Sequence, residues 1–216
     1  MNPSKTELAP LQDNEWRKRL RLVTDVVFAS AMTLMIFNIE IPNMEDIEDP
    51  VQLGAFLVKQ LSNMGVFFIT FVVIAIYWVK HLEHYSFITR VDQKFVWLQL
   101  FFLLCIMLLP FWNTYASLFA ENLAIKVFLS LNMILVGLFS YFSLQYASRP
   151  ANRMIHPGVS ENVLKTAKTE ILSEPLIAAL AGGLAFIDVE LWDIAFILIP
   201  VVYIGYKQIN KSKSGS

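Results

Sequence analysis

The chain has 216 residues, of which 56% are hydrophobic and only 16% are charged. Soluble domains usually carry about 25% charged residues, so a soluble core of this size could not hide so much apolar surface. The composition therefore indicates an integral membrane protein. The net charge of −1 gives no sign of nucleic-acid binding. The single cysteine, Cys105, excludes an internal disulfide framework and is expected to be a small buried hydrophobe.

Six apolar segments follow one another, and each approaches the roughly 20 residues that cross a bilayer core. They are Leu20–Ile41, Leu61–Val79, Phe95–Phe111, Ala124–Tyr146, Ile171–Ile187 and Leu191–Tyr206. We therefore expect an all-α membrane protein with a six-helix transmembrane domain over residues 19–207. A polar cytoplasmic segment precedes it at 1–18, without a cleavable signal peptide, and a flexible tail follows at 208–216.

The ends of two segments are also predictable. "EDPVQ" supplies Asp49 as an N-cap and Pro50 as the first helical residue, so the second helix should begin before its apolar part. "GVSENVLKTAKTE" predicts an amphipathic extension of the fifth helix into the headgroup region.

Basic residues are distributed asymmetrically between the connecting segments. The N-terminus, the second and fourth connections and the C-terminus hold 15 of the 17 lysines and arginines. Only Lys59 and Lys126 lie on the other side, which has the acidic loops "EIPNMEDIEDP" and "IDVELWD". The asymmetry predicts that both termini are cytoplasmic and favours an even number of helices.

The first segment contains an acidic residue, Asp25, about one turn inside the last arginine. A charge at the centre of a membrane helix costs roughly 2.5–3.5 kcal/mol, and less near the interface. Asp25 should therefore face protein and have a partner. The candidates are Arg19, Arg21, Trp78, His81 and His84. Asp25 is interpreted as a structural polar lock or, alternatively, as an ion or proton site.

Helical phase places a second set of residues on one stripe of this segment, at about 100° per residue. Asp25 lies roughly a quarter-turn or more away from it. Around an axis shared by several copies, the stripe would form a narrow and mostly apolar conduit with hydroxyl groups that replace part of a cation's hydration shell. Alternatively, the hydroxyls bond back to the helix or help helices pack. The stripe consists of Arg19, Val23, Val26, Ser30, Thr33 and Phe37.

Other motifs are weak. His81 and His84 are three residues apart, but no further ligand occurs at a matching spacing, so no metal or cofactor is expected. Gly182 and Gly183 suit close helix packing. No P-loop, dinucleotide fingerprint, hydrolase or zincin motif occurs, nor does a "TVGYG"-like filter. No enzyme is therefore predicted.

The first three segments resemble the lysosomal potassium channel family (transmembrane protein 175), in its bacterial branch. That family opens with Arg, three residues and Phe-Ser-Asp, followed by an apolar helix. Here Arg19 and "LRL" precede Val23-Thr24-Asp25 and "VVFASAMTLMIFNIEIP". The run "VIAIYWVKHLEHYSFITRVDQKFVWLQLFFLLCIMLLPF" matches the second and third helices, with Trp78-x-x-His81, an "RVD" loop and "LLPF". The resemblance covers Arg19 to Phe111.

The resemblance implies a homotetramer of six-helix subunits in the cell membrane, the inner membrane in a bacterium, with the first helix lining a pore for potassium and other monovalent cations. Ser30 matches the first apolar ring, Thr33 the selectivity ring and Phe37 a further ring. The family usually has Ile or Leu at the position of Ser30, so Val26, Leu34 or Phe37 is the expected gate. Arg19, Thr24, Asp25, Trp78 and His81 match a structural network at the cytoplasmic end.

Three functions remain open. The first is a passive potassium-permeable cation channel. The second is a proton-coupled secondary transporter in which Asp25 or His81 titrates. The third is a scaffold without transport activity.

Overall fold

The computed structural model describes residues 5–38 and 50–195, which fold almost entirely as helices. A further helical stretch is described over residues 189–195. The named elements are α1 (Lys5–Leu34), η1 (Met35–Asn38), α2 (Pro50–Ser86), α3 (Gln93–Leu118), α4 (Leu123–Ala147), η3 (Pro150–Asn152) and α5 (Glu161–Leu184).

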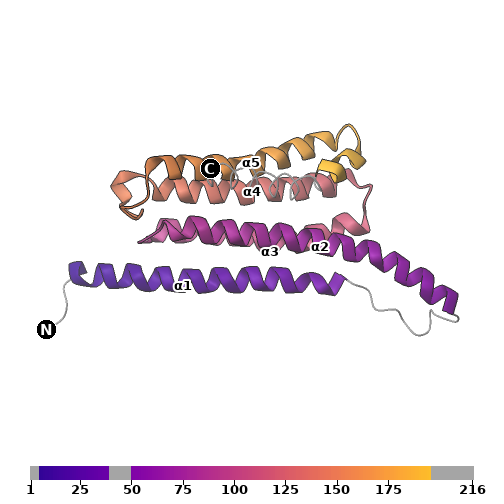
Figure 1. Cartoon of the computed structure of the whole chain (residues 1–216), viewed down its shortest axis with the longest axis horizontal. Helices are drawn as coiled ribbons and strands as arrows, with labels where there is room; N and C mark the ends of the chain where they lie inside the picture. Colours follow the sequence, from indigo (N-terminus) through magenta and orange to yellow (C-terminus); the bar gives the residue numbers. More distant parts are fainter. Residues whose placement is uncertain (1–4, 39–49, 196–216) are drawn as a thin grey trace, which may run out of the picture.

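Consecutive helices run in opposite directions, with α1 on one side, α2 and α3 in the middle, and α4 and α5 on the other side (Figure 1). Helix α1 packs on α2 and α3, and α4 lies between α3 and α5. The α2–α3 and α4–α5 connections meet at one end of the bundle, where the Thr89 amide donates to the Met154 carbonyl oxygen over 2.8 Å. The Tyr85 hydroxyl ties Arg17 of α1 to the same end, which we call the basic end.

The helix starts follow from capping residues. Asp92 accepts a hydrogen bond from the Phe95 amide at the start of α3, Asn122 accepts one from the Ile125 amide at the start of α4, and Ser160 accepts one from the Val163 amide at the start of α5. Each side-chain oxygen satisfies an amide that has no partner within its helix. Pro50 is the first residue of α2, as its fixed φ favours.

Large apolar side chains from four helices form the main core. Phe28 of α1, Ile74 of α2, Ile106 of α3 and Val136 of α4 all have 0% exposure and belong to one cluster. A second cluster at the basic end packs Leu20 with side chains of both connections. Burying these side chains orients α1, because only one of its faces carries them.

Helices α4 and α5 approach closely where one of them has a glycine. A Cβ atom on Gly137 would lie 2.5 Å from Cδ of Pro175, and one on Gly182 would lie 2.9 Å from Cβ of Ser130. A Cβ atom on Gly183 would meet no described residue within 4 Å. Of the two glycines predicted to pack helices, Gly182 therefore does so between α4 and α5.

The helices extend beyond the apolar segments from which they were predicted. Helix α1 begins at Lys5, inside the polar N-terminal segment, and α5 begins at Glu161, as its amphipathic extension predicted. In the described part of the chain, three helices are long and apolar enough to cross a membrane, namely Phe67–Ser86, Gln93–Ala116 and Leu123–Ala147. Most of the sixth predicted segment lies outside the described residues, as does Asp49.

Candidate functional site

Helix α1 has one face packed against the subunit and one face that no described residue covers. Leu20, Thr24, Phe28, Ala31 and Met35 are buried, and their spacing of three and four residues places them on one side of the helix. The opposite side of α1 is exposed in the single subunit. Among its exposed apolar side chains are Val23, Val26 and Leu34.

The indole of Trp78 in α2 donates a hydrogen bond from Nε1 to Oδ1 of Asp25 over 3.1 Å. Asp25 is partly buried. Among the described residues, no arginine forms a salt bridge with it, and both Arg19 and Arg21 are exposed. Of the five candidate partners, Trp78 is therefore the one in hydrogen-bond contact. A neutral donor satisfies the carboxylate without placing a second charge in the helix interface.

His81 contacts α1 through its ring packing on Phe28 and not through a hydrogen bond to Asp25. Its imidazole is 8% exposed and stacks on Tyr85 and Phe102, at centroid distances of 5.6 and 5.3 Å. The Phe28 ring of α1 lies 6.1 Å from it. The buried imidazole thus connects α1, α2 and α3 in one aromatic stack, a geometry in which ring pairs add to the gain from burial.

Two contacts of Arg17 complete this end of α1 and were not predicted. Its carbonyl oxygen accepts from the Tyr85 hydroxyl over 2.8 Å, and its Nη1 donates to the Thr89 carbonyl oxygen over 3.3 Å. Tyr85 lies one helical turn after His81, on the same face of α2. The spacing of four residues between His81 and Tyr85 is the feature of the sequence from which a contact of Tyr85 with α1 could have been predicted.

The residues predicted to line a pore lie on or near the exposed face of α1. Arg19, Val23, Val26, Thr33 and Leu34 are exposed, and Ser30 is partly exposed. The backbone of Phe37 lies in η1, while its side chain is outside the description. Thr24 does not lie on the exposed face. The residue is 2% exposed, and its hydroxyl donates to the Leu20 carbonyl oxygen inside the subunit.

The Thr33 hydroxyl donates to the carbonyl oxygens of Ala29 and Ser30, over 3.0 and 3.1 Å. This is the back-bonded geometry that the sequence left open. Because the proton is used within the helix, the lone pairs of Thr33 Oγ1 remain available to a donor or a cation. Back-bonding and a role in cation coordination are therefore compatible.

Two ion pairs between distant segments were not predicted. Lys80 of α2 pairs with Glu174 of α5, and both side chains are close to nine-tenths buried. Lys126 of α4 pairs with Asp193 and lies over the Trp192 ring, with Nζ 4.4 Å from the ring centroid. Buried charges in a membrane helix need such partners, but 94 and 67 residues of sequence separate them. No local pattern in the sequence relates residues so far apart.

The family model described as "Endosomal/lysosomal potassium channel TMEM175" matches residues 19–110, which span α1 to most of α3. A potassium channel of Streptomyces collinus is 28% identical over 199 residues, which are 88% of this chain and 92% of the relative. A potassium channel of Chamaesiphon minutus is 29% identical over 93 residues, which cover 43% of this chain and 45% of the relative.

Two crystal structures have similar folds. One is a lysosomal potassium-selective channel TMEM175 homologue from Chamaesiphon minutus, with a TM-score of 0.76, 19% identity, and 88% of this chain and 97% of that chain covered. The other is a variant of the potassium channel MtTMEM175 in complex with a nanobody–MBP fusion, with a TM-score of 0.59, 16% identity, and coverage of 89% and 93%.

Long apolar helices in an antiparallel bundle, with charged residues paired between them, define a helical membrane protein. The matches show that it is similar to the TMEM175 potassium channels, and the resemblance predicted from the sequence is thereby confirmed. The prediction that the chain is not an enzyme agrees with the matches, because the family and the relatives are ion channels.

Proposed function

We propose that the protein is a passive potassium-permeable cation channel of the cell membrane, formed by four copies whose α1 helices surround a central pore. The observation that carries the proposal is the division of α1 into two faces. One face is fixed in the subunit by Phe28 and by the Trp78–Asp25 hydrogen bond, while the stripe with Val26 and Thr33 is exposed in the described part of the chain.

The stripe has the chemistry that a pore without a filter loop needs. Exposed Val26 and Leu34 would form apolar rings that close by dewetting, and Oγ1 of Thr33 would offer an oxygen ring to a partly dehydrated cation. Ser30, between them, offers a second hydroxyl in place of a bulky ring. We therefore assign the constriction to Val26, Leu34 or Phe37, and cation choice to Thr33.

The relatives support the permeant ion, because both curated ones are named potassium channels. The full subunit of this proposal has six membrane helices and two cytoplasmic termini. Support for this orientation comes from the basic end, where the α2–α3 and α4–α5 connections meet α1 and bring together Arg17, Arg90, Arg149 and Arg153.

The test is potassium flux into proteoliposomes that contain the purified protein and a potassium gradient. We expect flux that follows the potassium gradient with no imposed pH gradient. Flux that requires a pH gradient would contradict the proposal in favour of a proton-coupled transporter. Absence of flux from correctly assembled protein would favour a scaffold.

A further inference from the structure

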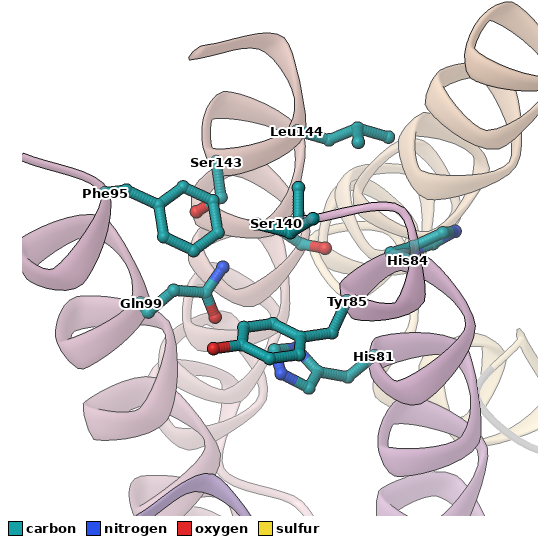
Figure 2. Close-up of a pocket in the computed structure, with 9 residues that line it drawn as sticks. His81, His84, Tyr85, Phe95, Gln99, Ser140, Ser143 and Leu144 are labelled. Atoms are coloured by element: carbon teal, nitrogen blue, oxygen red, sulfur yellow. The ribbon is translucent and has the colours of Figure 1, made fainter. Parts of the chain in front are cut away.

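A small recess lies between α2, α3 and α4 near the basic end, beside His81 (Figure 2). The space in which a water molecule can be centred is about 20 Å³. A polar cavity needs about 10–15 Å³ by this measure to hold one water molecule. The recess is therefore large enough for one water molecule and too small for a larger ligand.

Gln99 of α3 gives the recess an unpaired hydrogen-bonding group. Its side chain is 5% exposed, and among the described residues its fully enclosed Oε1 accepts no hydrogen bond. Figure 2 shows the amide in the space between Tyr85 and the two serines of α4, with its nitrogen toward the serines and its oxygen toward Tyr85. An enclosed polar atom without a partner destabilises the fold, so a bound partner would be stabilising.

The neighbouring hydroxyl groups determine what kind of molecule fits. Ser143 Oγ already donates to the Phe139 carbonyl oxygen over 2.7 Å, and the Tyr85 hydroxyl donates to Arg17. Both protons are thus used, and Ser143 presents only lone pairs to the recess. Ser143 Oγ and Gln99 Oε1 can only accept, whereas the Ser140 hydroxyl can also donate, so the occupant must be able to donate and to accept.

We propose that the recess binds a single water molecule, which hydrogen-bonds the Gln99 amide, donates to Ser143 Oγ and accepts from the Ser140 hydroxyl. These three hydrogen bonds are the usual number for a buried water molecule. A bare monovalent cation fits the chemistry less well, because none of the described residues that line the recess carries a carboxylate to compensate for lost hydration. Water also satisfies the Gln99 amide in either of its two orientations.

The water molecule joins α3 to α4 next to the stack of His81, Tyr85 and Phe102 that packs on Phe28 of α1. It thereby supports the wall against which the pore-lining helix rests. This supporting role depends on the proposed function, whereas the water site itself does not.

The test is a high-resolution structure of the assembled protein in potassium and, separately, in rubidium. We expect a density peak within about 3.2 Å of the Gln99 amide in both, without anomalous signal from rubidium. An empty recess beside a well-ordered Gln99 would overturn the proposal. Anomalous signal in the recess would also overturn it, because the occupant would then be a cation.

Two variants connect the peak to its ligand. Gln99→Leu should remove the peak, whereas Gln93→Leu, at the exposed start of the same helix, should keep it. If Gln99→Leu does not assemble, Ser143→Ala should lower the occupancy of the water. If the density peak of the water keeps its full height in whichever of Gln99→Leu and Ser143→Ala assembles, the assigned hydrogen-bond partners of the water are wrong. Absence of potassium flux in the unmodified protein would refute the channel but leave these density results interpretable.

Discussion

At the scale of single residues, Asp25 shows how an acidic side chain is accommodated inside an apolar helix. The carboxylate lies near the basic end, is partly buried, and accepts from the indole of Trp78. Its neighbour Thr24 satisfies itself by bonding back to Leu20. Both polar groups are therefore paired within the subunit, and the hydroxyl of Thr33 is the group that faces outward.

Removing the donor to Asp25 should destabilise the protein. Trp78→Phe keeps the ring but leaves the carboxylate without its partner, and we expect a loss of about 1.5–3 kcal/mol, the range for a hydrogen bond to a charged group. Thermal unfolding in mild detergent measures the loss. Trp97→Phe, at a 54% exposed indole of α3, is the control. Equal melting temperatures for the two variants would show that Trp78 has no locking role.

Replacing the outward hydroxyl should change ion selection rather than stability. We expect Thr33→Ala to lower the ratio of potassium to sodium permeability, because it removes the oxygen offered to the cation. Reversal potentials in a planar bilayer give the ratio. Thr169→Ala is the matched control, because Thr169 is also exposed and bonds back to the carbonyl four residues earlier. An unchanged ratio in Thr33→Ala would remove this residue from the filter.

The ion pair of Lys126 and Asp193 should respond unequally to the loss of each partner. The Lys126 side chain is 3% exposed and that of Asp193 is 47% exposed. Asp193→Asn leaves a buried cation, and we expect a loss on the order of 3 kcal/mol. Lys126→Met leaves a carboxylate that water can reach and should cost less. Thermal unfolding in detergent of both single variants and of the double variant measures these losses. A larger loss for Lys126→Met than for Asp193→Asn would contradict the assigned burial.

At the scale of elements, the contact between α4 and α5 depends on the absence of side chains at particular positions. Gly137 faces the rigid ring of Pro175, so α5 approaches α4 closely there. Ser130 lies against Gly182 and also accepts from the Trp192 indole over 2.7 Å. Close packing of this kind is the main source of helix association in a bilayer, where the hydrophobic effect between helices is absent.

Adding one methyl group should therefore have opposite effects at two glycines. Gly137→Ala places a Cβ atom 2.5 Å from Pro175, and we expect a loss of about 1–3 kcal/mol. Gly183→Ala meets no atom of the described residues within 4 Å and should be neutral or slightly stabilising, since alanine favours a helix. Melting temperatures measured side by side test this, and a tolerated Gly137→Ala would mean that the two helices are not in close contact.

At the scale of the whole molecule, the proposed channel exists only as an assembly, because the stripe of one subunit encloses nothing. In a Cys105→Ser background, we expect Val26→Cys to form disulfides between copies on mild oxidation. Leu176→Cys, at a 68% exposed position of α5, should not. Gel mobility reads the cross-link, and native mass spectrometry should count four copies. A monomer that conducts potassium would contradict the shared pore.

Much of the fold was predictable because bilayer thickness imposes a length and a polarity on each helix. The fourth apolar segment, Ala124–Tyr146, agrees with α4 to within one residue at each end. Helix α1 was less predictable, because its polar first turns carry no apolar signal and it begins at Lys5. The two faces of α1 were separated by helical phase, but the Gln99 recess was not foreseen, since its lining comes from three helices.

By itself, the sequence determined that this is a helical membrane protein, where most of its helices lie, and that the first of them has a mostly apolar stripe with two hydroxyl groups apart from Asp25. These properties follow from hydropathy and from the period of the helix, both of which act over short stretches. Only the tertiary structure decided which groups meet: Asp25 with Trp78, Lys80 with Glu174, and Gly137 with Pro175. Such pairs depend on how helices rotate and pack against each other, and packing acts between residues far apart along the chain.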